Sequence, residues 1–298
     1  MSRRRVAILA ARPGWHTDEL RRALAERGHE GRVLPYEALV ARLGGDGAEG
    51  VGLRAADEAL AQCTAVLARI IPAGSLEQIV FRVDALHALE ERGIPVVNTP
   101  RTIEQTVDKL WTTALLERAG LPVPETVVCE SAEEAAAAFR RLGDVIVKPL
   151  FGSMGLGMVR VSSQEMAFRV FRTLETIRGV YYLQRTLEHD GSDLRAFVVG
   201  ERVIGAIERR ALGWKTNLAR GGVARAVSLA PEHVDLALAA ARAVGADYAG
   251  VDLLPARDGT VYVLEVNGIP GWRGLQEATS LDVAGAIIEL VLGRLAGR

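Results

Sequence analysis

The sequence predicts an α/β protein in which a small parallel α/β domain is followed by two α+β subdomains. Two observations support this class. Short apolar runs alternate with amphipathic helical segments over the first hundred residues, the pattern of a parallel sheet flanked by helices. Further along, short β segments follow one another with few helices between them, and 298 residues are enough for two or three units.

The first unit is expected to span residues 1–98. Its helices have clear limits, because Ser75 can cap one of them, and Gly28 and Gly93 can each end one. The expected elements are strands at residues 5–10, 64–70 and 95–98, helices at 17–27 and 75–92, and a Gly-rich surface loop at 44–52.

Two further subdomains are expected at residues 99–183 and 184–298. The second unit starts near Thr99 with a helical pattern, and the third starts near Tyr181 with a run of strands. The expected helices are residues 102–118, 131–142, 231–244 and 281–295, and the expected strands are 126–129, 144–148, 158–161, 181–187, 194–199, 202–209, 250–255 and 260–266.

Composition excludes several classes of function. The 36 basic and 37 acidic residues leave a formal net charge of −1, which gives no reason to expect a nucleic acid or a membrane as partner. No apolar run approaches the roughly 20 residues that span a bilayer, and no signal-peptide pattern appears, so we expect a cytoplasmic protein. Cys63 and Cys129 are too few for a disulfide framework or a zinc site.

Lysine and asparagine are rare in this chain. The only lysines are Lys109, Lys148 and Lys215, and the only asparagines are Asn98, Asn217 and Asn267. In a sequence that otherwise uses Arg for its positive charges, Lys is expected where a compact point charge is needed. These six positions are therefore candidates for function.

The segment 151–158 is rich in glycine and follows Lys148 and Pro149. Three glycines in six residues would let backbone N–H groups turn towards an anion. The segment joins two expected strands and lacks the Gly-Lys-Ser/Thr end of a P-loop, so it is not a nucleotide fingerprint of the strand–turn–helix kind. Two interpretations of this segment are open: a flap that covers phosphates, and a plain flexible hairpin loop. The nearby lysine favours the flap.

A pair of expected strands near the C-terminus carries two carboxylates and an amide. If residues 256–259 form a four-residue hairpin loop, Asp252 faces Val263 and lies diagonal to Glu265. Asn267 then shares their face, as do Leu254, Val261 and Val263. The three oxygen-bearing side chains suit Mg²⁺, and two carboxylates this close need a cation between them. A solvated polar strand end is the alternative, and an odd loop length would move Asp252 to the opposite face.

Taken together, Lys109, the Lys148-Pro149 pair, the Gly-rich loop and the Asp252…Glu265-Val-Asn267 set resemble the ATP-grasp superfamily. The resemblance implies an ATP-grasp fold whose two α+β subdomains enclose the nucleotide. The finer likeness is to RimK-type α-L-glutamate ligases. It rests on residues 184–187, 191–200, 206–209, 217–222 and 250–252.

The resemblance also implies a role for each site residue. Lys109 and Lys148 would contact the ATP phosphates, and Asp193 the ribose. Arg195 and Arg209 would lie near the transferred phosphate. The remaining implied positions are Gly152, Ser153, Met154 and Gly155 in the flap, Gln184, Arg185 and Leu187 at the adenine, Asn217 and Arg220 at the second substrate, and Asp252, Glu265 and Asn267 at the metal.

The implied activity is a carboxylate–amine ligation through an acyl phosphate, with ATP and Mg²⁺, or Mn²⁺ in its place, as cofactors. The amine would be an amino acid, glutamate by likeness, and the acceptor a small-molecule or peptide carboxylate; residues 75–92 and 97–109 look most like members that glutamylate pterin-type cofactors. Arg185 and Thr186 depart from the acidic and aromatic residues usual there. A small-molecule kinase, a catalytically inactive nucleotide-binding protein and a homo-oligomer remain open.

Overall fold

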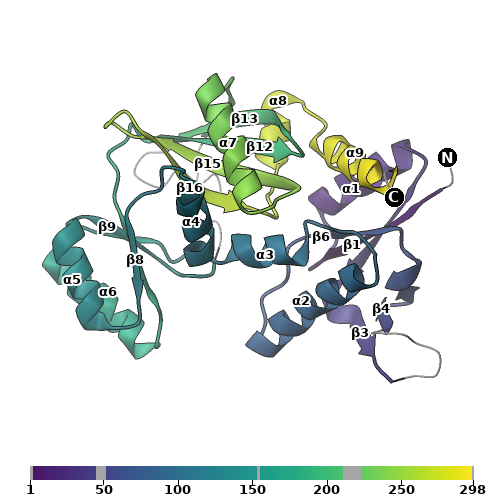
Figure 1. Ribbon diagram of the computed structural model, residues 1–298, viewed down its shortest axis with the longest axis horizontal. Helices are drawn as coiled ribbons and strands as arrows, with labels where there is room; N and C mark the ends of the chain where they lie inside the picture. The colour runs from purple at the N-terminus through teal and green to yellow at the C-terminus, as the bar shows by residue number, and fades with distance from the viewer. Residues whose placement is uncertain (1–2, 45–51, 153–154, 211–222, 297–298) are drawn as a thin grey trace.

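The computed structural model describes residues 3–44, 52–152, 155–210 and 223–296. Within these residues the strands form four sheets, and the three largest belong to three consecutive parts of the chain (Figure 1). The α/β class predicted from the sequence is confirmed.

The N-terminal part contains a parallel sheet in the order β2-β1-β6-β7, as the alternation of strands and helices predicted. β1 has the predicted bounds, and Ser75 caps α2 through a reciprocal capping box with Gln78. β2 was not predicted, because its residues lack a continuous apolar run. The elements are β1 (Arg5–Ala10), α1 (Trp15–Glu26), β2 (Glu30–Pro35), β6 (Ala65–Ala68), α2 (Leu76–Glu91) and β7 (Val96–Val97), and a small antiparallel sheet holds β3 (Leu39–Arg42), β4 (Gly52–Ala55) and β5 (Glu58–Ala59).

The single helix expected at residues 102–118 is in fact two helices, α3 (Pro100–Val107) and α4 (Lys109–Arg118). The break lies at Asp108, whose extended backbone (φ −89°, ψ 108°) ends one helix, while its carboxylate caps the next by accepting the N–H of Trp111 at 3.1 Å. Lys109 therefore opens α4 instead of lying in the middle of a helix. Hydrophobic periodicity does not reveal such a break, since it continues across the cap.

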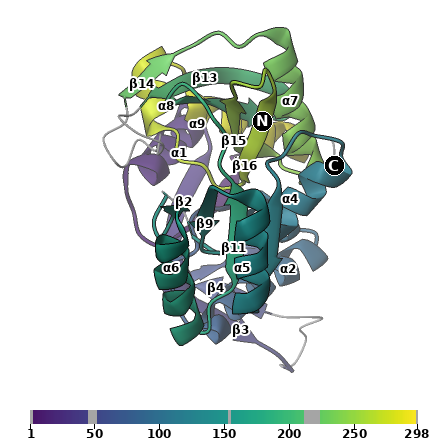
Figure 2. The ribbon, with the colours of Figure 1, turned by 90° about the vertical axis from the view of Figure 1, so that its left-hand side faces the viewer.

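The central part is an antiparallel sheet in the order β10-β9-β11-β8, with α5 and α6 packed on one face (Figure 2). The sequence patterns predicted these strands and α5 but made no prediction for α6, which Ser163 caps. The elements are β8 (Thr126–Cys129), α5 (Ala132–Leu142), β9 (Val145–Lys148), β10 (Val159–Val161), α6 (Gln164–Thr176) and β11 (Tyr181–Arg185).

The C-terminal part is a five-stranded antiparallel sheet in the order β14-β13-β12-β15-β16. α7 and α4 cover one face of this sheet in a shared apolar core. The elements are β12 (Ser192–Val199), β13 (Arg202–Arg210), β14 (Val223–Ala226), α7 (Pro231–Ala243), β15 (Tyr248–Pro255), β16 (Val261–Asn267), α8 (Arg273–Thr279) and α9 (Val283–Ala296).

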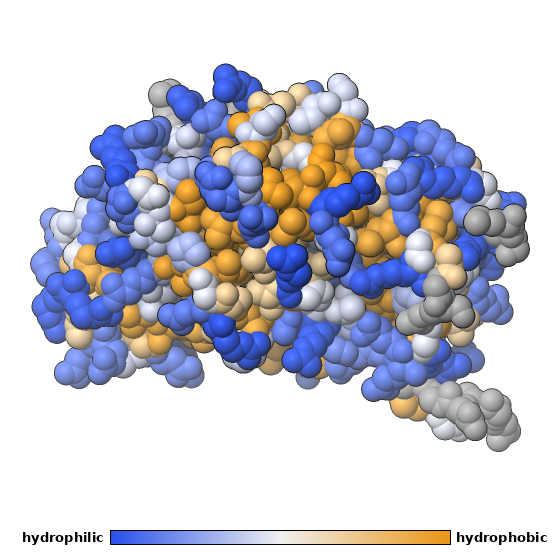
Figure 3. Space-filling model, turned by 45° about the horizontal axis from the view of Figure 1, so that its top comes forward, coloured by the Kyte–Doolittle hydropathy of each residue, from blue (hydrophilic) through white to orange (hydrophobic). Residues whose placement is uncertain are grey.

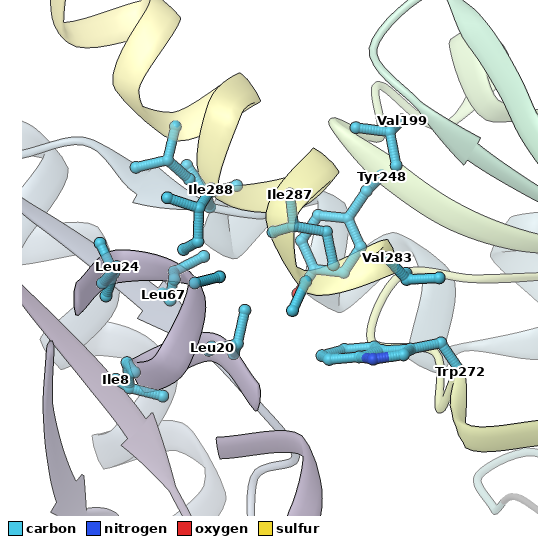
Figure 4. Close-up of a cluster of buried hydrophobic side chains, with 14 of the residues drawn as sticks. Ile8, Leu20, Leu24, Leu67, Val199, Tyr248, Trp272, Val283, Ile287 and Ile288 are labelled. Atoms are coloured by element: carbon cyan, nitrogen blue, oxygen red, sulfur yellow. The ribbon is translucent and has the colours of Figure 1, made fainter. Parts of the chain in front are cut away.

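The first and last parts of the chain share one apolar core. α9 lies against α1, and its Ile287 and Ile288 pack with Leu20 of α1 and with Trp272 (Figure 4). Burying these side chains on both elements stabilises the contact by removing apolar surface from water. The N-terminal sheet is therefore held firmly beside the sheet that carries the predicted metal ligands.

Asn98, one of the six candidate positions and one to which the resemblance gave no role, joins these two parts. Its side chain is fully buried, and its amide donates to the carbonyls of Tyr248 and Gly268. Its Oδ1 accepts the N–H groups of Asp247 and Tyr248. Only a side-chain amide offers donors and an acceptor in this arrangement, which explains an asparagine here.

Replacing Asn98 with alanine is expected to lower the free energy of unfolding by about 3–5 kcal/mol, because several buried backbone groups would lose their partners. Urea unfolding followed by circular dichroism measures this loss. Asn98→Asp keeps the acceptor but removes both donors, so it should destabilise the protein too. A loss below about 1 kcal/mol for both variants would contradict this account.

Apolar residues extend across the middle of the face that carries α7, α8 and α9, and hydrophilic residues lie around its edges (Figure 3). Among the described residues, none of the helices has both the length and the apolar character required to cross a membrane.

Candidate ATP-binding site

A cavity lies where the central sheet, the C-terminal sheet and α4 meet. Its walls come from β9, β11, β12, β13, β15 and β16, and from the start of the Gly-rich segment. Eleven of the residues predicted from the sequence line it: Lys109, Lys148, Gly152, Gly155, Gln184, Arg185, Leu187, Asp193, Arg209, Asp252 and Glu265. The fold thus brings together residues that are up to 156 positions apart in the chain.

Two lysines enter this cavity from different elements. Lys109 opens α4, and its Nζ donates to the carbonyl of Gly152 at 2.7 Å. Lys148 ends β9, and its Nζ donates to Oε1 of Gln184 at 2.6 Å. Burial, with a smaller contribution from the charge of Lys109, lowers the pKa of Lys148 to about 8 against the opposing charges of Glu265 and Asp252. Burial also lowers the pKa of Lys109.

The hairpin of β15 and β16 differs from the predicted one in two ways. Pro255 pairs with Val261, so the connection has five residues instead of four, and Leu264 is an extra, bulged residue. Each change alone would move Glu265 to the other face, but together they cancel. Asp252 therefore lies directly opposite Glu265, not opposite Val263 as predicted.

Along β16, the sheet face predicted for each side chain is correct only for the residues that follow the bulge at Leu264. Glu265 lines the cavity with Asp252 and Leu254. Val261 and Val263, which were expected on this face, pack instead in the core beneath α7. The reason is that the bulge reverses the alternation of side chains along β16.

Two arginines hold the carboxylate of Asp252. Arg195 binds it with two hydrogen bonds of 2.6 and 2.8 Å, and Arg209 approaches it at 2.9 Å. Burial acts to raise the pKa of Asp252, but the two guanidinium groups outweigh it and lower the pKa to about 2. Arg209 also makes two hydrogen bonds of 2.6 Å to Asp193. Arg195 does not itself line the cavity.

Glu265 differs from Asp252 and Asp193. Its carboxylate makes no hydrogen bond to, and no ion pair with, any residue in the described part of the chain, yet its charge acts on both lysines. Asn267 lies two positions further on the same strand, and its Oδ1 accepts the N–H of Ile269 at 3.0 Å. Asn267 does not line the cavity.

These donors fit a Mg²⁺ ion. Two carboxylates on opposing strands supply hard oxygen atoms, and those of Glu265 have no other described partner. Mg²⁺ needs only one or two carboxylates, because water and phosphate complete its coordination. No cluster of three or more His, Cys, Asp or Glu residues suited to a metal occurs among the described residues.

Part of the cavity wall is apolar, and backbone groups lie beside these apolar residues. Ile146, Met158, Leu187 and Leu254 contribute to its walls. The N–H of Leu187 donates to no described residue, whereas that of Arg185 donates to the carbonyl of Glu125 at 2.8 Å. A planar base could therefore accept a hydrogen bond from the N–H of Leu187. At Arg185 it could donate only to the carbonyl, because the N–H is already engaged.

Several predicted residues lie outside the described residues: Ser153, Met154, Asn217 and Arg220. Sequence reasoning also missed cavity residues, chiefly Thr113 and Tyr182, whose hydroxyl groups are 2.9 Å apart. Nothing in their local sequence marks them, because Tyr182 reads as an ordinary residue of a buried strand.

Comparison with known proteins agrees with this geometry. Residues 106–291 match the RimK-like ATP-grasp domain. The tetrahydromethanopterin:alpha-L-glutamate ligase of Methanosarcina acetivorans is 38% identical over 265 residues, covering 79% of this chain and 82% of the relative. A probable alpha-L-glutamate ligase of Trichodesmium erythraeum is 31% identical, covering 96% of this chain and 95% of the relative.

Solved structures show the same fold. The RimK domain ATP-grasp protein of Sphaerobacter thermophilus has a TM-score of 0.76 and 25% identity, covering 97% of this chain and 100% of its own. The ATP-grasp ligase PsnB, in a complex with a minimal precursor, Mg and ADP, has a TM-score of 0.76 and 23% identity, covering 97% of each chain. The chain therefore belongs to the RimK-like ATP-grasp family and is an ATP-dependent ligase.

Proposed function

We propose that this ligase adds L-glutamate to the carboxylate of an acceptor, with ATP and Mg²⁺ as cofactors. The observation that carries the proposal is a cavity in which two lysines face a pair of carboxylates. The relatives named above as glutamate ligases support the choice of glutamate. Mn²⁺, a similar oxygen-preferring ion, is the second metal to test.

The chemistry explains why such a cavity is needed. A carboxylate does not react with an amine at neutral pH, because its carbon is electron-rich and oxide is a poor leaving group. In the first step an acceptor carboxylate oxygen bonds to the γ-phosphorus of ATP, and ADP leaves with the electrons of the broken P–O bond. In the second step the amine attacks the carbonyl carbon, phosphate leaves, and the amine loses a proton.

The proposed roles follow the positions of the charges. Lys109 and Lys148 would hold the phosphates, and Arg195 and Arg209 would stabilise charge on the transferred group and the acyl phosphate. Mg²⁺, when bound, neutralises phosphate oxygens. Asp252 and Glu265 would hold it, with Asn267 as a third ligand. Gly152 and Gly155 would approach the phosphates, and Gln184, Arg185, Leu187 and Asp193 would bind the nucleoside.

Pterin-type cofactors are the first acceptors to examine. A relative that covers most of this chain is named for tetrahydromethanopterin. We therefore propose a pterin-type cofactor as the acceptor.

The experiment is an assay of ADP formation with ATP, Mg²⁺, each amino acid and candidate acceptors, with the product identified by mass. We expect ADP release to require both an acceptor and glutamate, and the product to gain one glutamyl residue. A kinase would release ADP with the acceptor alone, and a nucleotide-binding protein without catalysis would release none.

A further inference from the structure

Two arginines in the N-terminal part are buried without an acidic partner. Arg69 follows β6 and is 3% exposed, and Arg82 in α2 is 4% exposed. Over the described ranges, no carboxylate oxygen lies within 4.0 Å of either guanidinium group. Because an unpaired buried charge is costly, such a pair points to a ligand that supplies the negative charge.

The other buried charges in the described residues behave differently. Glu58 is paired with two arginines, Asp247 with Arg294, and Asp193 and Asp252 with Arg209. The fold therefore neutralises buried charge elsewhere, and Arg69 and Arg82 depart from that rule.

Neutral groups hold the two arginines in place. Arg69 donates to the Tyr248 hydroxyl at 3.1 Å and to the Pro270 carbonyl at 3.0 Å, and its guanidinium lies 4.7 Å from the centre of the Trp272 ring. Arg82 donates to the Pro72 carbonyl at 2.7 Å. These contacts fix the orientation of both side chains, but the partners are neutral and do not balance the two positive charges.

Both arginines meet the loop that follows β6, because Arg69 begins this loop and Arg82 donates to its Pro72 carbonyl. Burial raises the pKa of the Tyr36 hydroxyl, and the charges of Arg69 and Arg82 both oppose that rise, so both lie near this group. The hydroxyl itself donates to the backbone carbonyl of Arg69 at 3.2 Å. Burial, together with the charges of Arg69 and Arg273, lowers the pKa of His16 to about 4. His16 is therefore neutral at pH 7, and the positive charge in this region comes from the arginines.

The guanidinium group of Arg82 is not closed off completely from its surroundings. Among the described side chains, the buried N and O atoms without a hydrogen-bond partner are Trp272 Nε1 and Gln276 Oε1 alone. The nitrogen atoms of Arg82 that make no hydrogen bond are therefore not sealed from solvent.

The position of the pair connects it with the ligase site. Tyr36 and Arg69 lie at the carboxyl ends of β2 and β6, the edge of a parallel sheet where ligands commonly bind. Pro270, which accepts from Arg69, also packs against Gly250, and a Cβ at Gly250 would lie 3.7 Å from Arg195. Arg69 is thus linked through the loop that holds Pro270 to Arg195, the arginine that holds Asp252.

We propose that Arg69 and Arg82 bind a second anionic group of the acceptor, a carboxylate or phosphate remote from the carboxylate that is ligated. This inference rests on the proposed function, because it assigns the group to the acceptor of that reaction. Two guanidinium groups suit an oxyanion with several acceptor atoms. The pair would select acceptors that carry at least two anionic groups.

The test measures binding without turnover. The wild-type protein is saturated with Mg²⁺ and a non-hydrolysable ATP analogue, which fills the phosphate positions near Lys109 and Lys148. Inorganic phosphate or glutarate is then titrated at constant ionic strength while the thermal unfolding midpoint Tm is followed. We expect a saturable rise in Tm for the wild type, and about tenfold or greater loss of affinity in Arg82→Met. Comparing phosphate with glutarate shows which oxyanion is preferred.

Two further variants separate binding from folding. Arg82→Lys keeps a charge and should retain part of the affinity. Arg294→Met removes an arginine that does have a carboxylate partner, so it should lower the starting Tm but keep the anion-dependent rise. Arg82→Met should lower the starting Tm less than Arg294→Met does, since it loses the hydrogen bond to Pro72 but removes a charge that has no acidic partner.

The proposal is wrong if the wild type shows no saturable rise, if Arg82→Met responds to both anions as the wild type does, or if it loses as much Tm as Arg294→Met. Absence of glutamate addition in the ADP assay would instead overturn the proposed function and leave the anion measurements standing.

Discussion

Replacing Glu265 with alanine is expected to lower turnover by about 10²–10³-fold or more while the protein remains folded. Of the three carboxylates that line the cavity, Asp193 and Asp252 are held by arginines, whereas Glu265 has no partner among the described residues. Its oxygen atoms are therefore the ones available to a metal ion. The measurement is the rate of ADP formation at several Mg²⁺ concentrations.

A carboxylate on the same hairpin provides the control for Glu265→Ala. Asp258 lies in the exposed turn between β15 and β16, where it accepts from Thr260 and Tyr262. Asp258→Asn should leave turnover close to that of the wild type. A folded Glu265→Ala protein with wild-type turnover would show that Glu265 holds no essential metal ion.

The second large effect is expected at Lys148. Lys148→Met should weaken ATP binding by about 10²-fold, because a charge-assisted contact with phosphate is lost from a site sheltered from water. The side chain stays close in length, and the hydrogen bond to Gln184 is lost with the charge. Calorimetric titration with the non-hydrolysable analogue measures this loss.

The pH dependence gives an independent check on Lys148. Because the pKa of Lys148 is about 8 in the free protein, its ammonium group is charged at pH 7 and loses its proton as the pH rises through that value. The protonated form is the one that attracts the triphosphate, so affinity should fall by up to about tenfold for each pH unit above 8. Binding in that range should take up a proton.

Lys148→Arg is the matched variant, since its guanidinium group stays charged over the whole range. In this variant the affinity for ATP should no longer fall above pH 8, even if the variant binds ATP less tightly than the wild type does. An unchanged fall in Lys148→Arg or Lys148→Met would assign the pH dependence to another group.

Part of the site could be predicted because local sequence carries chemistry. Lys148 stood out because it is one of only three lysines in the chain and because it lies beside a Gly-rich segment. Glu265 and Asn267 stood out as polar residues on an otherwise apolar strand. The capped ends of α2 were also readable, because capping depends on residues within one turn. Arg69 and Arg82 could not be singled out in this way, because a buried arginine looks like any other in an Arg-rich chain.

The sequence alone therefore determined the α/β class, most strands and helices, and the kinds of side chain that the chemistry needs. Only the tertiary structure decided how these side chains meet. The five-residue turn and the bulge at Leu264 set which residue faces Asp252, and Asn98 revealed its role only once its four partners from distant segments were in place. The physical reason is that periodicity and capping arise between near neighbours in the chain, whereas register, burial and charge pairing arise between segments that only folding brings into contact.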